Sequence, residues 1–200
     1  PTEAGLGGGS ADGAGVLRGL NLLWHLGRSE DELCRLGVKI GADVPFCILG
    51  GTAQAQGIGE ILTPLPSPTP PLWLILVKPN LALSTRWVYE TFDLVEKRSK
   101  ERKTDLMKEA LFRNDINRII ANLSNDLEQA VIPNYPLIGE LKRQLILAGA
   151  EGTLMAGSGS VVFGITYSKD KAEAIADKLR SYPEVQEVFV ASTLNKEGRS

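Results

Sequence analysis

Pro1-Thr2-Glu3-Ala4-Gly5-Leu6-Gly7-Gly8-Gly9-Ser10-Ala11-Asp12 is the densest glycine segment of the chain, with four glycines within residues 5–9. Glycines in this number expose backbone N–H groups and let a polyphosphate approach the chain closely. Apolar residues at helical spacing predict a helix over residues 12–26, whose N-terminal dipole would point at the same place. The segment therefore predicts a phosphate-binding turn, in which Ser10 can hydrogen-bond a phosphate or give an oxygen to Mg²⁺.

Two common phosphate-binding patterns are missing from this segment. No Gly-Lys-Ser/Thr follows, as it would in the Walker pattern, and no strand or ribose-binding acid stands where a dinucleotide fingerprint needs it. A flexible linker or a plain turn is the alternative interpretation. A linker would seldom run directly into a capped amphipathic helix, so we favour phosphate binding.

Length, composition and charge fit one large or two small globular domains. The 200 residues are 43% hydrophobic and 23% charged with a net charge of −2, so we expect no nucleic-acid partner and no membrane association. Cys34 and Cys47 are too few for a zinc site or a disulfide framework, which favours a cytoplasmic setting. Because no strand precedes the glycine segment, we also expect a fragment that lacks an N-terminal part.

The remaining pattern predicts an α+β protein with two domains, at residues 1–68 and 72–200, joined where five prolines fall within residues 64–71. Ser29 and Glu32 form a capping-box signature for a helix over residues 30–39. Helices of the second domain should pack on one face of a sheet. Strands are expected at 44–49, 52–56, 72–77, 153–156, 161–166 and 185–190, further helices at 85–92, 104–112, 115–121, 125–131, 136–147 and 169–180, and a solvated loop at 96–103.

Two further segments carry residues that can do chemistry. Asp43 lies in Gly41-Ala42-Asp43-Val44-Pro45, where its carboxylate can orient a hydroxyl and accept its proton during phosphoryl transfer. From composition alone, a cap or turn aspartate is the more common role for such a residue. The small-residue turn Gly157-Ser158-Gly159-Ser160 is either an ordinary hairpin turn or a second backbone cradle for phosphate, and spacing does not decide between them.

Three motifs in this order resemble the GHMP kinases, the superfamily of galactokinase, homoserine kinase, mevalonate kinase and phosphomevalonate kinase. Residues 1–12 resemble its phosphate-binding motif, and Met155-Ala156-Gly157-Ser158-Gly159-Ser160 is similar to its third, C-terminal glycine-rich motif. Within the superfamily the chain is most similar to the 4-diphosphocytidyl-2-C-methyl-D-erythritol kinases. That similarity is carried by Gly41-Ala42-Asp43-Val44-Pro45-Phe46, Gly50-Gly51-Thr52-Ala53, Gly57-Ile58-Gly59-Glu60, Asn125-Asp126-Leu127-Glu128 and Gly149-Ala150-Glu151-Gly152.

The resemblance implies an ATP-dependent kinase of the non-mevalonate isoprenoid pathway, acting on the 2-hydroxyl of 4-diphosphocytidyl-2-C-methyl-D-erythritol. Asp43 would be the catalytic base and would contact the substrate, together with Thr85 and Tyr89. Mg²⁺ would lie near Ser10. The ATP phosphates would be held by Pro1, Thr2, Glu3, Ala4, Gly5, Leu6, Gly7, Gly8, Gly9, Ser10 and Ala11, and from the other side by Gly157, Ser158, Gly159 and Ser160.

The resemblance also implies a two-domain fold, with part of a ribosomal-protein-S5-like domain followed by a ferredoxin-like α+β domain. The enzyme would act as a monomer or homodimer in the cytoplasm, or in the plastid of a plant or alga. The family's catalytic lysine precedes the glycine segment, so this fragment is expected to be inactive or weak. Its first domain is expected to expose apolar strand surface and to aggregate when produced alone. The alternatives are a GHMP kinase for another alcohol, of mevalonate or homoserine type, and a non-catalytic nucleotide-binding module.

Overall fold

The computed structural model describes residues 5–95 and 103–194, which form two compact units. The N-terminal unit comprises Gly7–Ser67 with residue 194, and the C-terminal unit comprises Pro68–Thr193 with residues 5 and 6. The loop predicted at 96–103 falls almost entirely outside the described residues.

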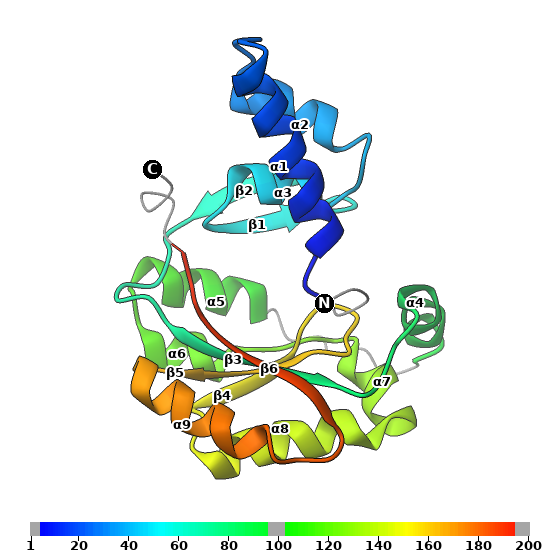
Figure 1. Ribbon diagram of the computed structural model, residues 1–200, viewed down its shortest axis with the longest axis vertical. Helices are drawn as coiled ribbons and strands as arrows, with labels where there is room; N and C mark the ends of the chain where they lie inside the picture. The colour runs from blue at the N-terminus through cyan, green and yellow to red at the C-terminus, as the bar shows by residue number, and fades with distance from the viewer. Residues whose placement is uncertain (1–4, 96–102, 195–200) are drawn as a thin grey trace. The chain divides into compact units, whose positions relative to one another are not determined.

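Within its described residues, the N-terminal unit consists of helices and one β-hairpin (Figure 1). The elements are α1 (Gly8–Leu23), α2 (Glu30–Gly37), α3 (Val44–Leu49), β1 (Thr52–Gln56) and β2 (Ile61–Leu65), with β1 and β2 antiparallel. A small core holds the helices together, and its buried members are Ala14, Leu33, Val44 and Ile48. The predicted strand at 52–56 is confirmed, and Pro64 belongs to β2 although it was expected in the linker.

Helix α1 begins earlier than the predicted residue 12 and ends earlier than residue 26. At its start, Gly7 has φ +65° and turns the chain so that the two following glycines already belong to the first helical turn. At its end, His25 has φ +49°, a left-handed conformation that stops the helix before Gly27. Both limits depend on backbone conformations that the apolar spacing does not encode.

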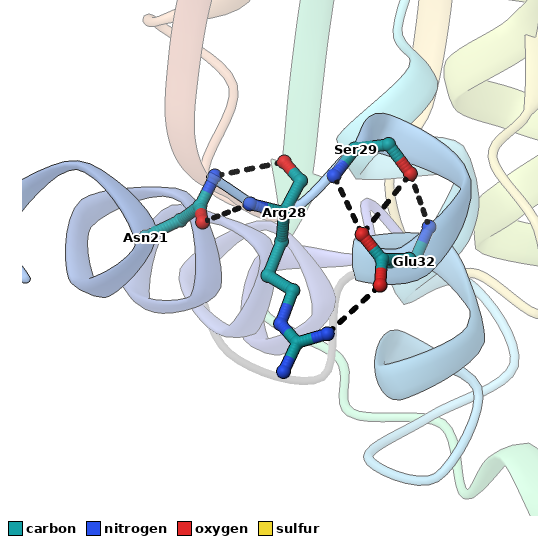
Figure 2. A network of polar contacts seen from close by, with 4 residues as sticks. All are labelled: Asn21, Arg28, Ser29 and Glu32. Atoms are coloured by element: carbon teal, nitrogen blue, oxygen red, sulfur yellow. Dashed lines mark hydrogen bonds and ion pairs between the residues drawn. The ribbon is translucent and has the colours of Figure 1, made fainter. Parts of the chain in front are cut away.

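The capping box at the start of α2 is confirmed (Figure 2). Ser29 Oγ accepts from the Glu32 N–H at 3.3 Å, and Glu32 Oε2 accepts from the Ser29 N–H at 3.0 Å. Arg28 adds an ion pair to Glu32 at 2.8 Å, while Asn21 of α1 bonds both backbone groups of Arg28. These donors, the Ser29 N–H foremost and then Arg28, hold the pKa of Glu32 below its ordinary value.

Residues 44–49 form helix α3, so the strand predicted there is wrong. A six-residue apolar run fits a buried strand or a buried helix equally well, and the residues around it decide. Pro45 lies in the first turn, where proline favours a helix start, and Gly50 ends the helix at φ +65°. Arg18 of α1 then donates to the carbonyl of Ile48, one of the last groups of α3.

The C-terminal unit contains a four-stranded antiparallel sheet in the order β4-β5-β3-β6. Its strands are β3 (Trp73–Pro79), β4 (Gly152–Met155), β5 (Val162–Thr166) and β6 (Val185–Ser192). With helices between β3 and β4 and between β5 and β6, the order is that of a ferredoxin-like fold. The predicted strands of this unit and the predicted α+β class are therefore confirmed.

The helices of this unit are α4 (Thr85–Asp93), α5 (Lys103–Phe112), α6 (Ile116–Ala121), α7 (Glu128–Asn134), α8 (Pro136–Ala148) and α9 (Lys169–Leu179). Helices α8 and α9 lie together on one face of the sheet, as Figure 1 shows. Ile75 and Val77 of β3 point into this core and are completely buried, whereas Leu74 and Leu76 on the other face are half-buried. The predicted packing of helices on one sheet face is confirmed for α8 and α9.

Candidate functional site

The start of helix α1 is open to solvent. Within the described residues its first turn has no side-chain cap and no acidic residue, and a methyl group added at Gly7 or Gly9 would meet nothing within 4 Å. The first backbone bond of the helix runs from the Ala11 N–H to the Gly7 carbonyl, so the N–H groups of residues 8–10 have no partner within the helix. These donors and the helix dipole together suit an anionic group.

Ser10 lies in this first turn, next to the segment that leads into α3. A Cβ added to Gly41 would lie 3.8 Å from Ser10 Oγ and 3.6 Å from a methyl group of Val44. The absence of a side chain at Gly41 therefore leaves the hydroxyl room beside the turn that carries Asp43. The N-terminal unit thus brings the two predicted residues Ser10 and Asp43 into one neighbourhood.

Asp43 stands at the N-cap position of α3, but its carboxylate does not cap the helix. The residue is exposed, and the described part of the chain offers its carboxylate no hydrogen bond and no ion pair. The hairpin turn passes close by, since a Cβ added to Gly59 would lie 3.6 Å from Asp43 Oδ1. The carboxylate therefore makes no bond within the described part of the chain, and its predicted role as catalytic base stays a prediction.

The second glycine turn joins β4 to β5 and is held from both sides. Gly157 and Gly159 have φ of +52° and +84°, and a Cβ at Gly159 would come within 2.9 Å of the Leu83 and Met155 side chains. Asn125 donates from Nδ2 to the carbonyls of Met155 at 2.9 Å and Gly157 at 2.7 Å. Both glycines are thus required by backbone shape and close packing.

The two glycine segments meet in the C-terminal unit. Gly5 has φ +71°, and a Cβ on it would lie 2.0 Å from the Ala156 carbonyl oxygen, which no side chain could tolerate. In the other direction, a Cβ on Gly157 would lie 3.1 Å from the Gly5 carbonyl oxygen. Backbone therefore lies directly against backbone at this point. The contact fixes Gly5 against the turn, and the role of residues 157–160 as a phosphate cradle stays a prediction.

The two serines of the second turn have internal partners. Ser158 Oγ lies 3.0 Å from Thr85 Oγ1, and Ser160 Oγ donates to the Leu81 carbonyl. Ser160 is completely buried, so it supports the turn from inside and cannot reach a ligand in this conformation. Direct phosphate contact stays a prediction for Gly157, which is exposed, and for Ser158.

Thr85 and Tyr89, predicted to contact the substrate, lie one turn apart on α4 and so share a face of that helix. Ser84 caps the helix by accepting from the Trp87 N–H at 3.4 Å. Trp87 packs edge-on against Tyr135, with ring centroids 5.1 Å apart. Because α4 is anchored by these contacts, Tyr89 stays exposed on a fixed helix.

Sequence reasoning missed Lys78 as a member of this region. It ends the apolar run of β3 and is buried, yet its ammonium group reaches Ser160 Oγ at 3.1 Å and the Leu81 carbonyl at 2.9 Å. The sequence offers one signal for it, a lysine at the end of a buried apolar run. Asn125 lies in a segment that is similar to the family, but no local pattern signals its bonds to the glycine turn.

The predicted site residues thus form two sets, one in each unit. The joint role of the two sets in one phosphate site stays a prediction, and Pro1, Thr2, Glu3 and Ala4 lie outside the described residues. Among the described residues no cluster of three or more His, Cys, Asp or Glu side chains is suited to a metal ion. A search of the same residues finds no helix with the length and apolar character needed to span a membrane.

Comparison with known proteins gives matches over both units. The family model described as GHMP kinases N terminal domain matches residues 1–51, and the model described as GHMP kinases C terminal matches residues 107–185. The chain is 46% identical over 198 residues to a 4-diphosphocytidyl-2-C-methyl-D-erythritol kinase of Shouchella clausii, covering 99% of the chain and 65% of that relative. The corresponding kinase of Geobacter metallireducens is 47% identical over 179 residues, covering 90% of the chain and 61% of the relative.

Solved structures agree with these matches. A crystal structure of 4-(cytidine 5'-diphospho)-2C-methyl-D-erythritol kinase superposes with a TM-score of 0.80 at 33% identity, covering 96% of the chain and 67% of that protein. Homoserine kinase from Cytophaga hutchinsonii gives a TM-score of 0.81 at 20% identity, covering 98% of the chain and 67% of that protein, which shows a shared fold. The chain spans less than two thirds of the length of the curated relatives named above. By sequence and by fold, the chain belongs to the GHMP kinase family.

Proposed function

We propose that this protein is an ATP-dependent kinase that phosphorylates the 2-hydroxyl of 4-diphosphocytidyl-2-C-methyl-D-erythritol, a step of non-mevalonate isoprenoid synthesis. One observation carries the proposal: the carboxylate of Asp43 is exposed and unpaired among the described residues, in a segment whose Gly41 lies against Ser10 at the open start of α1. A carboxylate with no structural role next to an anion-binding helix start is suited to phosphoryl transfer. The identity of 46% to a relative of this name supports the choice of substrate.

In the proposed reaction Asp43 orients the substrate hydroxyl and accepts its proton. The hydroxyl oxygen forms a bond to the γ-phosphorus, the bond from that phosphorus to the bridging oxygen breaks, and ADP leaves. Little covalent chemistry falls to the protein in such a transfer, so catalysis depends on position and on charge stabilisation. The N–H groups at the start of α1 would stabilise charge on the phosphates, and Thr85 and Tyr89 would position the substrate.

The residues at the start of α1 fit a nucleotide with Mg²⁺. The open space around Gly7 and Gly9 admits a phosphate group, and the Ser10 hydroxyl offers one oxygen ligand. Mg²⁺ is usually held by one or two protein oxygens, by phosphates and by water, so a cluster of carboxylates is not needed. When bound, the ion neutralises charge on the transferred phosphoryl group.

A direct test measures ADP release by the full-length protein with ATP, Mg²⁺ and 4-diphosphocytidyl-2-C-methyl-D-erythritol. We expect turnover in the wild type and a loss of at least about 100-fold in kcat for Asp43→Asn, because general-base catalysis typically contributes this much. Asp31→Asn, at an exposed position in the first turn of α2, is the matched control and should keep full activity.

Homoserine and mevalonate serve as alternative acceptors in the same assay. Turnover with either of them, and none with the diphosphocytidyl substrate, would replace the proposed substrate by another alcohol. Nucleotide binding without turnover on any acceptor would favour a non-catalytic module. An Asp43→Asn variant that folds normally and retains full activity would remove the proposed base.

A further inference from the structure

Lys78 is a buried cation that the proposed mechanism does not use. The residue is only 7% exposed and lies at the end of β3, the strand that pairs with both β5 and β6. Its ammonium group donates to the Leu81 carbonyl at 2.9 Å and to Ser160 Oγ at 3.1 Å. Both partners are neutral.

The charge of this ammonium group has no counter-charge in the described chain. No carboxylate in residues 5–95 and 103–194 forms an ion pair with Lys78, although Glu187 stands opposite it in the register of β3 and β6. Burying a cation is costly unless it is paired, so lysines are almost never buried alone. An anionic ligand that binds nearby would supply the missing charge.

The partners of Lys78 lead directly to the second glycine turn. Ser160 ends that turn, and Leu81 belongs to the segment that joins β3 to α4. Two residues from Ser160, Ser158 bonds Thr85 at the start of α4. Lys78, Ser160 and Leu81 thus form one polar network that ties the end of the glycine turn to the segment before α4. The Ser158–Thr85 bond is a separate pair that holds the same turn to α4.

We propose that Lys78 is a positioning residue that fixes the 157–160 turn and provides the buried positive charge for a phosphate group bound there. The assignment rests on the proposed function, because the phosphate would belong to ATP or to the diphosphate of the acceptor. Lys78 acts through Ser160 and through its charge, while the ligand contacts would come from the turn itself.

The positioning role can be measured without any ligand. In the full-length protein, Lys78→Met keeps most of the apolar stem and removes the donor, so peptides covering residues 156–161 should exchange their amide hydrogens about tenfold faster. Peptides from β6 should be unchanged. Lys171→Met, which removes an exposed lysine paired with Glu151, is the control and should leave the turn unaffected. Unchanged exchange in the turn of Lys78→Met would overturn the positioning role.

The charge role is tested by titrating ATP and CDP separately into wild type, Lys78→Met and Lys78→Arg. We expect Lys78→Met to lose about tenfold in affinity for one of the two, with partial recovery in Lys78→Arg, since a charged hydrogen-bond network is lost and then partly restored. A loss of affinity for ATP alone shows that the turn binds a phosphate of the phosphoryl donor. A loss of affinity for CDP alone shows that it binds the diphosphate of the acceptor. Equal affinities in all three proteins, or a wild type that binds neither compound, overturn the charge role.

These readouts separate the two proposals. If the wild type does not phosphorylate the diphosphocytidyl substrate but Lys78→Met still loses ATP affinity, the proposed substrate fails and the role of Lys78 stands. If Lys78→Met does not fold, Ser160→Ala removes one hydroxyl of the network and keeps the charge. That variant should show faster amide exchange in residues 156–161 and a smaller, about threefold, loss of nucleotide affinity. Amide exchange and nucleotide affinity that both equal those of the wild type overturn the proposal.

Discussion

The hydroxyl of Ser158 in the second glycine turn lies 3.0 Å from the hydroxyl of Thr85, the first residue of α4. The two residues are 73 positions apart in the chain, so the bond joins a loop predicted to contact phosphate to a helix predicted to contact substrate. A displacement of either element changes the environment of the other. Substitutions at this bond therefore test stability and ligand binding together.

Thr85→Val should weaken the C-terminal unit by about 1 kcal/mol, because the hydrogen bond is lost while side-chain volume is kept. Thr85→Ser should retain the stability. Ser158→Ala should cost a similar amount, and the double variant should cost less than the sum, since the second change removes a bond already broken. Urea denaturation of wild type, Thr85→Val, Ser158→Ala and the variant with both changes measures this coupling. Strict additivity would show that the two hydroxyls do not interact in solution.

Two alanine substitutions in the first glycine segment, Gly5→Ala and Gly9→Ala, should have opposite effects on the stability of the fold. Gly5→Ala would place a Cβ 2.0 Å from the Ala156 carbonyl oxygen at a positive φ, so we expect a marked loss of stability. Gly9→Ala meets nothing described within 4 Å and lies in a helix, so it should stabilise by up to about 1 kcal/mol.

The Gly9→Ala variant also tests the anion-binding role of the α1 start. If phosphate approaches the backbone there, Gly9→Ala should gain thermal stability and lose ATP affinity in the same protein. Calorimetric titration and thermal unfolding of that variant provide both numbers. A stabilised protein with undiminished ATP affinity would argue against close approach of the nucleotide at Gly9.

The carboxyl group of Glu140 on α8 should titrate far below its ordinary range. Hydrogen bonds from Arg143 and then from Gln144 lower its pKa from 4.5 to about 2. Because the folded-state pKa is depressed, the stabilisation is complete above pH 4.5 and is lost as the pH falls toward 2. The difference in melting temperature between wild type and Glu140→Gln should therefore shrink over this interval. NMR titration should also show the Glu140 pKa rising in Arg143→Met.

The 200-residue chain produced by itself should self-associate through an exposed apolar surface on α1 and the turn after it. This surface comprises Val16, Leu22, Leu23 and Trp24, which are 59%, 75%, 70% and 61% exposed. We expected exposed apolar residues on strands, whereas these exposed apolar residues lie on and just after a helix. Ile61 of β2 is an exposed apolar residue on a strand. Exposed apolar side chains in this number are an aggregation liability.

Light scattering after size-exclusion chromatography can measure this association. Leu22→Gln with Leu23→Gln should reduce it without lowering the melting temperature, because neither side chain is buried. Leu147→Gln, at a similarly exposed position on α8, is the control and should have no effect. A monodisperse wild-type chain with a cooperative melt would contradict the prediction.

Features set by neighbouring residues in the sequence were predictable. The capping box of Ser29 and Glu32 depends on two residues three positions apart, which the sequence displays directly. The strands of the C-terminal unit follow from their apolar runs. The apolar run of α3 fits a strand as well as a helix, and the signals that favour the helix are Pro45 in its first turn and Gly50 at its end.

Features set by distant residues were not predictable. Lys78 carries no local signal of its bond to Ser160, 82 positions later, and Gly5 none of its contact with Ala156. For Asp43 the sequence allowed both a cap and a catalytic carboxylate. The structure shows no cap bond from Asp43, which lies in the turn before α3, and its catalytic role stays a prediction.

The strand order β4-β5-β3-β6 also governs when the C-terminal sheet can form during synthesis. The first strand of this sheet in the chain, β3, is a central strand whose neighbours are β5 and β6. Just before β3, the Leu72 N–H donates to the hydroxyl of Thr193, which lies 121 positions later. At a translation rate of roughly 5–20 residues per second, β3 waits on the order of 10 seconds for either neighbour to emerge. The nascent chain therefore carries an unpaired apolar strand until β5 emerges, and this interval is when a chaperone would have to protect it.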